Sequence, residues 1–411
     1  MRQIISSIDL GSFSIKVLIG QIINSKIEII GIGSSESRGV KEGEILNIEQ
    51  LSKSLSYAIR EAENMSGIKI SSAIVNLSNK YVRGENSKGI CVITNEERMI
   101  TQNDVNRAVE NAKDIHIPSE YQLLHVLSRE YIVDKKTNVS DPIGMTGFRL
   151  EADVHVVMAP KVQINTIFKI FQKMEIEIEH IILNSIASSE AILKESERNS
   201  GCIVIDFGFG VSDVCIYIDG GIYHTFSLPL GASYLTSDLE YAFKIPFEIA
   251  EFIKRRDGVA SVEDVDPTQR IELPHIMGSS KKIIYLKDLV NVLESRIEEI
   301  FGIIYKIIRK KVDKNLLSGG VILTGGGSLL TGIAKVVEKI FGLPSRIGKP
   351  IGIEGLFNEV HSPEFSTSVG MIKFFSKQIR DDFKEIENYE RYPIKKEKKI
   401  LNKLKNWIEN I

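Results

Sequence analysis

The fold of this chain is decided by residues 7–17, which read SIDLGSFSIKV, and by residues 204–214, which read VIDFGFGVSDV. In each stretch a β-rich run ends at an Asp, small turn residues follow, and a second β-rich run returns. Asp9 and Asp206 therefore mark the same point of two similar hairpins. The repeat predicts two similar lobes that face one another.

The residue types in both turns suit a phosphate group. Glycine permits positive φ angles and lets backbone N–H groups approach phosphate oxygens without a Cβ in the way. Taken alone, each segment would be an ordinary tight hairpin with a solvated Asp. Two facing turns would instead hold the β- and γ-phosphates of a nucleotide, with hydroxyl donors from serines and a point charge from lysine. The candidate phosphate ligands are Gly11, Ser12, Phe13, Ser14, Lys16, Gly208, Phe209 and Gly210.

Two further features complete the predicted site. Asp9 and Asp206, at the ends of the incoming strands, are placed to hold the waters of Mg2+, an ion that keeps most of its hydration shell in proteins. A buried strand predicted at residues 321–324 runs into Gly325-Gly326-Gly327 and then into an amphipathic helix. Such glycines let the backbone lie flat against a base or a ribose. Together the three turns predict a site for a nucleotide and Mg2+.

The composition limits the classes of protein. The 411 residues are 43% hydrophobic and 26% charged, which predicts a soluble folded protein of two or more domains. A net charge of −2 offers no broad positive field, so no nucleic-acid partner is expected. No stretch resembles a signal peptide or reaches the about 18 apolar residues of a spanning helix, so we expect the protein to stay inside the cell. Cys91, Cys202 and Cys215 form no CxxC pair and are expected to be buried reduced thiols.

The last residues carry a separate pattern. Large apolar residues recur with the spacing of one helix face, and lysines occupy the opposite face. A short basic amphipathic helix with a Trp near its end indicates an interfacial membrane anchor, after an acidic, apolar-poor linker at residues 381–395. The alternatives are a helix docked on its own domain and a two-heptad coiled coil. The candidate membrane contacts are Ile400, Leu401, Leu404, Trp407, Ile408, Ile411, Lys399 and Lys403.

These motifs, in this order, resemble the actin/Hsp70/sugar-kinase ATPase superfamily. Within it the sequence is similar to the FtsA family of actin-like bacterial cell-division proteins, and the likeness covers nearly the whole chain. The matching segments are residues 31–45, 123–157, 228–243 and the C-terminal tail, and the middle ones are specific because ordinary actins and chaperones lack them. The resemblance implies an α/β, actin-like ATPase fold of two lobes, each with a mixed central sheet, and ATP with Mg2+ in the cleft between them.

The resemblance also implies a domain plan. The small subdomain usual on the first lobe is absent, and a differently placed one is inserted. Within the insert, β-rich runs near residues 89–94 and 152–158 flank a helix that begins near Thr101, where Thr-x-x-Asp offers a cap. The implied ranges are 1–84, 163–194 and 358–380 for the first-lobe core, 85–162 for the insert, 195–226 and 306–357 for the second-lobe core, 227–305 for its small subdomain, 381–395 for a flexible linker and 396–411 for the amphipathic helix.

The resemblance assigns roles to further residues. Carried over residue by residue, Glu251 and Lys254 match the helix that touches the adenosine, and Gly231 joins the nucleotide-binding candidates. The implied partner is the C-terminal peptide of the tubulin-like division protein FtsZ, docked on the small subdomain. A long helix predicted over residues 288–311 carries Arg296 on its polar side, which we take as the candidate contact with that acid-bearing peptide, although a solvated arginine is the alternative.

Two departures from the superfamily pattern bear on the chemistry. The second turn usually reads Asp-x-Gly-Gly-Gly-Thr, whereas Phe209 and Val211 stand here, which predicts weaker phosphate contact. Where fast hydrolases place a Glu or Gln that orients the attacking water, this chain has Asn184. Asn cannot act as a base and is shorter than Gln by a methylene, so slow or absent hydrolysis is predicted, with Asp9, Asp206 and Asn184 as the catalytic candidates.

The implied function is that of a division protein on the inner face of the cytoplasmic membrane, at the division septum. It would bind ATP, polymerise into filaments, tether the FtsZ ring through its C-terminal helix and recruit later division proteins. Two other classes stay open. A small-molecule phosphotransferase of the same fold would need a base beside the acceptor hydroxyl, for which the sequence offers no candidate. A nucleotide-gated scaffold of pilus or secretion machinery would lack the division partner.

Overall fold

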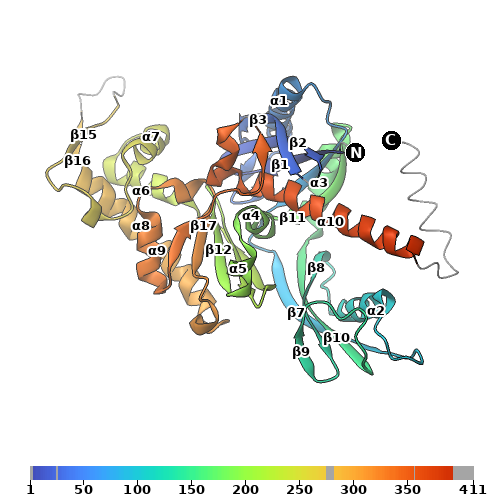
Figure 1. Cartoon of the computed structure of the whole chain (residues 1–411). Coiled ribbons are helices and arrows are strands. Elements are labelled where there is room, and N and C mark those ends of the chain that lie inside the picture. Colours follow the sequence, from blue (N-terminus) through green and yellow to red (C-terminus); the bar gives the residue numbers. More distant parts are fainter. Residues whose placement is uncertain (1–2, 25, 275–281, 356, 392–411) are drawn as a thin grey trace. The chain divides into compact units, whose positions relative to one another are not determined.

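The computed structural model of the chain describes residues 3–24, 26–274, 282–355 and 357–391, with side chains up to residue 378 (Figure 1). Its internal contacts divide it into a large unit, Met1–Ile372, and a second unit that begins at Lys373. The large unit contains two mixed sheets and a separate inserted sheet, so the predicted α/β class is confirmed.

The first sheet is built on the hairpin predicted at residues 7–17. Its three antiparallel strands are β1 (Gln3–Leu10), β2 (Ser14–Ile23) and β3 (Lys26–Glu36). Parallel strands β6 (Ser72–Leu77) and β11 (Glu177–Leu183) extend it beside β1, and the short β19 (Glu354–Gly355) lies beside β3. Most residues of β1 and β2 are buried, as expected for central strands covered on both faces.

The second sheet is built on the hairpin predicted at residues 204–214. Its antiparallel strands are β12 (Cys202–Phe207), β13 (Ser212–Ile218) and β14 (Gly221–Leu228), and its parallel strands are β17 (Val321–Thr324) and β18 (Ser345–Ile347). Cys202 and Cys215 lie in these strands, and all three cysteines are free and buried, as predicted.

The two sheets share one strand order. One reads β3-β2-β1-β6-β11 and the other β14-β13-β12-β17-β18, each with an antiparallel meander followed by two parallel strands. The hairpin registers match as well, since Asp9 pairs with Lys16 and Asp206 pairs with Asp213. The residue seven positions after the Asp is therefore cationic in one hairpin and anionic in the other.

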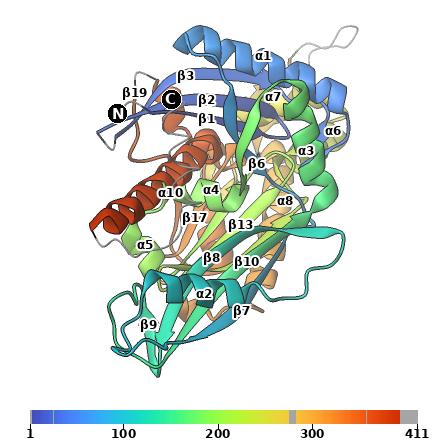
Figure 2. The same cartoon turned by 90° about the vertical axis from the view of Figure 1, so that its right-hand side faces the viewer.

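Helix α1 (Ile48–Ser66) packs across β2 and β3 (Figure 2). It begins after Asn47, whose side chain accepts a hydrogen bond from the Gln50 N–H at 3.0 Å, and it ends at Gly67 with φ 71°. Between β3 and α1 the chain forms only the short hairpin of β4 (Val40–Lys41) and β5 (Glu44–Ile45). The remaining core helices are α3 (Lys161–Lys173), α4 (Asn184–Ile192), α5 (Glu195–Asn199) and α9 (Ile333–Phe341).

The insert is a four-stranded antiparallel sheet in the order β7-β10-β8-β9, with α2 across one face (Figure 2). Helix α2 begins after Thr101 as predicted, and the side chains of Thr101 and Asp104 form a reciprocal cap. The β8–β9 hairpin is not predicted from the sequence, because few of its residues are fully buried and the alternation is weak. The elements are β7 (Arg83–Val92), α2 (Gln102–Ala112), β8 (Tyr121–Val133), β9 (Lys136–Val139) and β10 (Arg149–Pro160).

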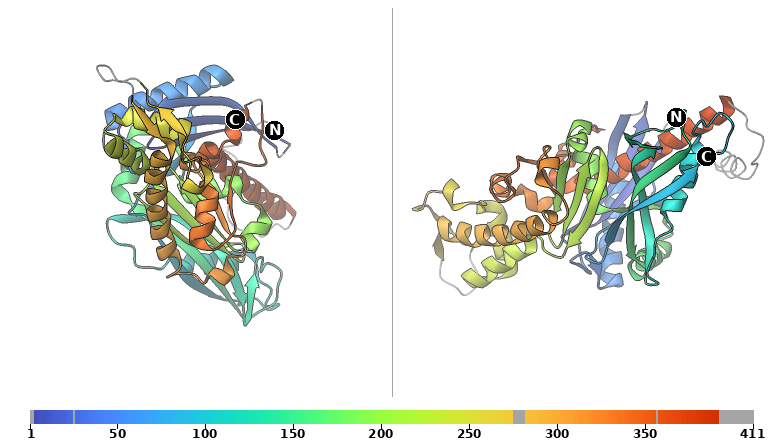
Figure 3. Two further views of the ribbon diagram at one scale, coloured as in Figure 1. Left: turned by 90° about the vertical axis from the view of Figure 1, so that its left-hand side faces the viewer. Right: turned by 90° about the horizontal axis from the view of Figure 1, so that it is seen from below.

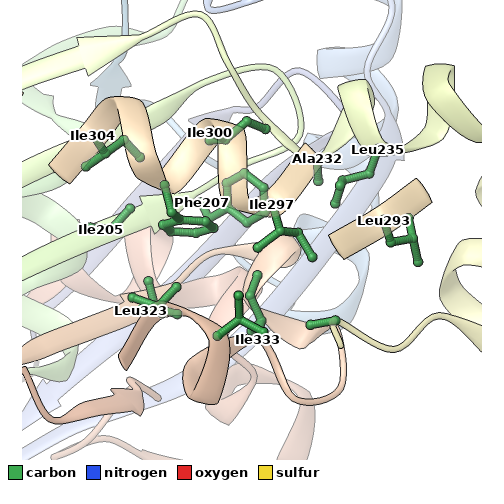
Figure 4. Packing of buried hydrophobic residues seen from close by; sticks show 14 of the residues in the cluster. Ile205, Phe207, Ala232, Leu235, Leu293, Ile297, Ile300, Ile304, Leu323 and Ile333 are labelled. Carbon is green, nitrogen blue, oxygen red and sulfur yellow. The ribbon is translucent and has the colours of Figure 1, made fainter. Parts of the chain in front are cut away.

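The second sheet packs against a group of helices. Helix α8 packs against it: the rings of Phe301 and Phe207 have centroids 5.2 Å apart, and Ile297 and Ile300 belong to the same buried cluster (Figures 3 and 4). The helix predicted over residues 288–311 is observed at Leu286–Ile308. The other elements of this region are α6 (Ala232–Phe243), α7 (Phe247–Asp257), β15 (Arg270–Glu272) and β16 (Ile283–Tyr285).

Helix α10 (Ser366–Arg391) continues from the large unit into the second unit. The structure thus differs from the flexible linker predicted at residues 381–395, because the backbone is helical up to Arg391. Residues 381–391 contain no Gly or Pro, and their Glu, Lys and Arg residues favour helix. In the part of the chain that is described, no helix has enough length and apolar character to span a bilayer. The predicted membrane helix, residues 396–411 with all its candidate contacts, lies outside the described residues.

Candidate functional site

A cavity of about 360 Å³ lies within the large unit where the three glycine-rich turns meet. The turn between β1 and β2, the turn between β12 and β13, the turn after β17 and side chains of α7 all line it. Gly231 does not line the cavity. The predicted residues that do are Asp9, Gly11, Ser12, Phe13, Ser14, Lys16, Asn184, Asp206, Gly208, Phe209, Gly210, Glu251, Lys254, Gly325, Gly326 and Gly327.

Both hairpin turns need glycine at the same position. A Cβ on Gly11 would lie 2.6 Å from the Ser14 carbonyl oxygen, and a Cβ on Gly208 would lie 2.9 Å from the Val211 carbonyl oxygen. In each turn the chain therefore folds back too tightly for a larger residue. The two turns are thus equivalent in backbone geometry as well as in sequence.

The second turn lies against the first turn and against α6. A Cβ on Gly210 would lie 2.9 Å from the Ser12 Oγ, so a larger residue would separate the two turns. The first two N–H groups of α6 donate to carbonyl oxygens of the second turn at 2.9 and 2.8 Å. Gly231 immediately precedes α6, and a Cβ there would lie 2.6 Å from the Phe209 carbonyl carbon. Gly231 therefore supports the turn from behind instead of lining the cavity.

Asn76, at the end of β6, holds the first turn. Its side chain accepts a hydrogen bond from the Leu10 N–H at 2.6 Å and donates to Asp9 at 2.8 Å and to Asn184 at 2.7 Å. Sequence reasoning missed Asn76. The signal that could have found it is a polar residue near the end of an otherwise buried, strand-like run, Ser72–Leu77.

Three carboxyl groups are buried at the cavity. Burial, with the neighbouring Asp213 carboxyl adding to the effect, raises the pKa of Asp206 to about 7. Burial likewise raises the pKa of Asp213 to about 6. Burial raises the pKa of Asp9, and the positive charge of Lys16 partly offsets this increase. Burial thus disfavours the ionised form of each carboxyl, and a bound cation would favour it.

Two hydroxyl groups hold the second-sheet acids from outside that sheet. Ser78, directly after β6, donates to both oxygens of Asp213 at 2.9 and 2.8 Å. Thr367, in the first turn of α10, donates to Asp206 at 3.0 Å. Both hydroxyl residues line the cavity, and sequence reasoning missed both. The acids of one lobe are therefore hydrogen-bonded by elements outside that lobe's sheet.

The third turn and α7 form the other side of the cavity. Gly325 adopts φ 80°, a left-handed conformation, and a Cβ there would collide with the Asp206 carboxylate. Lys254 on α7 donates to Glu251 at 2.6 Å and to Thr236 at 2.8 Å. Burial lowers the pKa of Lys254, and the Glu251 carboxylate opposes this. Glu251 and Lys254 thus form a partly buried ion pair facing the cavity.

The donor set fits a hydrated magnesium ion. Among the residues described, no group of three or more His, Cys, Asp or Glu side chains is arranged to ligate a metal directly. The carboxylates of Asp9 and Asp206 line one cavity, and burial raises the pKa of both. A divalent cation held through water would offset the cost of ionising them.

Arg296 lies on α8, away from the cavity. Its guanidinium donates to both oxygens of Asp238 at 2.6 and 2.9 Å, and it also pairs with Glu299. The Arg296 side chain, predicted to contact an acid-bearing peptide, is therefore already paired with two carboxylates of this chain. A peptide carboxylate would have to compete with them for the guanidinium.

Comparison with known proteins settles the family. One family model, described as cell division protein FtsA, matches residues 203–370, and another, described as an SHS2 domain inserted in FTSA, matches residues 79–158. The cell division protein FtsA of Borreliella burgdorferi is 35% identical over 408 residues, which cover 99% of this chain and 98% of that protein. The chain belongs to the FtsA family. It is thus an actin-like protein of bacterial cell division.

Solved structures agree with the predicted fold. A structure of the PilM-PilN type IV pilus biogenesis complex matches with a TM-score of 0.63 and 15% identity, covering 90% of this chain and 98% of that one. MreB5 of Spiroplasma citri bound to ADP matches with a TM-score of 0.56 and 14% identity, covering 93% and 98%. These likenesses confirm the actin-like fold of this FtsA family member.

Proposed function

We propose that the cavity binds ATP and that this FtsA family member is a nucleotide-dependent scaffold of cell division. The observation that carries the proposal is the convergence of three glycine-rich turns, three buried carboxyls and Lys16 on one cavity. Backbone N–H groups and a lysine suit phosphate oxygens. Mg2+, held through water by Asp9 and Asp206, would supply neutralising charge. The likeness to an ADP-bound MreB5 supports the choice of an adenine nucleotide.

We propose slow turnover. The Asn184 amide accepts a hydrogen bond from Asn76, which holds it at the cavity wall. An amide cannot take a proton from water, so Asn184 can orient a water molecule without activating it. The main role of the nucleotide would then be to change the conformation of the protein when it binds, and its hydrolysis would matter less.

The assembly role rests on the family and on the sequence of the tail. We propose that the protein polymerises on the inner face of the cytoplasmic membrane, anchored by residues 396–411. There it would tether the FtsZ ring by binding the FtsZ C-terminal peptide on the small subdomain, and it would recruit later division proteins. One tail would bind weakly, whereas a filament presents many tails at a high effective concentration.

Titration with a fluorescent ATP analogue, with and without Mg2+, tests the binding site. In the presence of Mg2+, Lys16→Ala and Asp9→Ala are each expected to weaken binding by about 10- to 100-fold, since each removes a charged contact of about 1.5–3 kcal/mol. Lys53→Ala is the matched control, because Lys53 pairs with Glu49 on the exposed side of α1. Unchanged affinity in both cavity variants would show that the nucleotide does not bind there.

A second candidate function is a nucleotide-gated scaffold of pilus machinery, which the structural likeness to a chain of the PilM-PilN type IV pilus biogenesis complex favours. The two functions differ in the partner. Binding of a synthetic FtsZ C-terminal peptide to the full chain would support the division role, and its absence at high peptide concentration would favour the pilus role.

A further inference from the structure

An aromatic pair joins the two hairpin turns at the exposed rim of the cavity. Phe13 of the first turn and Phe209 of the second turn have ring centroids 5.0 Å apart. Phe209 also contacts Phe247 of α7, with centroids 6.2 Å apart and the rings nearly perpendicular. Phe13 is 41% exposed although it lines the cavity, so one part of its ring remains open to solvent. The position of Phe13 is thus fixed from the second-lobe side.

Arg255 on α7 lies over Phe13. Its guanidinium carbon is 5.5 Å from the ring centroid, within the range of a cation–π contact. Because Phe13 belongs to the first turn and α7 packs with the second-sheet elements, this contact reaches across the cavity. An arginine held over a ring still has N–H donors at the edge of its guanidinium plane.

The other cationic side chains that line the cavity each lie near a carboxylate, and Arg255 differs from them in this respect. Lys254 and Arg256 are ion-paired with carboxylates of α7, at 2.6 Å each, and Lys16 faces the buried Asp9. In the described part of the chain, no carboxylate lies within ion-pairing distance of Arg255. Its positive charge is therefore available to an anion entering the cavity.

We propose that Arg255 binds a phosphate group of the nucleotide and that Phe13, supported by Phe209, positions it. The inference rests on the proposed nucleotide site and adds a phosphate ligand to it. Phosphate oxygens accept paired hydrogen bonds from a planar guanidinium more favourably than from a point charge. The superfamily pattern does not predict a large side chain at position 209. The proposal explains Phe209, because its ring supports the Phe13 ring over which Arg255 lies.

The test compares three ligands on the full chain. ATP, ADP and adenosine are titrated by calorimetry against the wild type, Arg255→Ala and Arg270→Ala, at two salt concentrations. Arg270 is a matched control, since it lies over the Tyr285 ring and does not line the cavity. We expect Arg255→Ala to weaken ATP and ADP by about tenfold, to leave adenosine unchanged and to reduce the salt dependence of ATP binding.

The outcomes separate this inference from the function on which it rests. If the wild type binds none of the three ligands, the nucleotide site itself is refuted, and the role of Arg255 with it. If the wild type binds ATP and Arg255→Ala binds it equally well, only the inference is refuted. An equal loss for all three ligands would mean that Arg255 acts on the nucleoside or on the fold, and would also overturn the phosphate assignment.

The positioning role of Phe13 has its own readout. Phe13→Leu keeps an apolar side chain but removes the aromatic face, and it should lower the ratio of ATP to adenosine affinity several-fold. Phe13→Tyr keeps the ring and should restore the ratio. In a protein that already carries Arg255→Ala, adding Phe13→Leu should not lower the ratio of ATP to adenosine affinity any further. If the effects of the two substitutions add, Phe13 acts independently of Arg255.

Discussion

At the scale of single residues, the buried acids of the second hairpin control how stability depends on pH. Asp206 and Asp213 pair across β12 and β13, and burial raises their pKa values to about 7 and about 6. An Asp in an unfolded chain has a pKa of about 3.9. Between about pH 4 and pH 7 the folded state therefore binds more protons than the unfolded state. Stability should fall as the pH rises through this window.

This predicts that removing one acid flattens the pH profile. Without nucleotide or divalent metal, the free energy of unfolding of the wild type should fall by an amount on the order of a few kcal/mol between pH 4.5 and pH 8. Asp206→Asn, which mimics the neutral acid, should lose much less. Urea unfolding at several pH values measures the difference, with the exposed Asp114→Asn as the control. Parallel profiles for the wild type and Asp206→Asn would contradict the burial argument.

The site residues that could be predicted from the sequence are those that lie within a short, recognisable sequence motif. Asp9, Lys16 and Asp206 belong to hairpins of about a dozen residues, so a repeat in the sequence is enough to find them. Asn76 and Ser368 reach Asp9 from positions 67 and 359 residues away, with hydrogen bonds of 2.8 and 3.5 Å. Their role depends on strand order and on the path of α10, which no local pattern contains.

At the scale of elements, the second turn depends on the start of α6. The close approach of Gly231 to the Phe209 carbonyl leaves no room for a side chain. Because the first N–H groups of α6 also bond to that turn, a shift of α6 would move the turn with it. The glycine thus supports the proposed nucleotide site without lining the cavity.

Gly231→Ala is therefore predicted to weaken ATP-analogue binding by about tenfold and to lower the free energy of unfolding by about 1–3 kcal/mol, as overpacked sites do. Gly302→Ala in α8 is the matched control, since a Cβ there meets nothing within 4 Å. That control should leave binding unchanged and stabilise the fold by up to about 1 kcal/mol. Fluorescence titration and thermal unfolding measure both quantities. Normal binding by Gly231→Ala would show that the turn can adapt.

Elements with strong local signals follow the sequence prediction, and weaker ones do not. Helix α2 has its reciprocal cap, and α8 has a regular apolar stripe, so both are found close to the expected residues. The segment at residues 381–391 is acidic and poor in apolar residues, which suggested a linker. Helix propensity prevails there because no helix-breaking residue interrupts the continuation of α10.

At the scale of the whole molecule, the proposed anchor and the nucleotide site occupy different parts of the chain. The cavity is formed entirely within the large unit, and its residues end at Thr367. The predicted amphipathic helix occupies residues 396–411. Loss of the helix should therefore affect membrane binding and leave nucleotide affinity unchanged.

Co-sedimentation with vesicles of anionic and neutral lipid tests this separation. The full chain should sediment with anionic vesicles, and a chain that ends at residue 395 should not. Replacing Leu404 with Asp in the full chain should abolish binding, whereas Lys399→Glu with Lys403→Glu should remove only the preference for anionic lipid. Retained binding by the shortened chain would place the membrane contact elsewhere, and ATP-analogue titration of each variant provides the control.

The matched registers of the two hairpins have one more consequence, for the direction in which a ligand lies. A groove made of two equivalent bends would accept a linear chain of phosphates equally well either way round. Lys16 and Asp213 occupy corresponding positions of the two hairpins and both line the cavity, so the two hairpins offer a phosphate chain different chemical groups. This difference should favour one orientation of the ligand, with its most highly charged end toward Lys16.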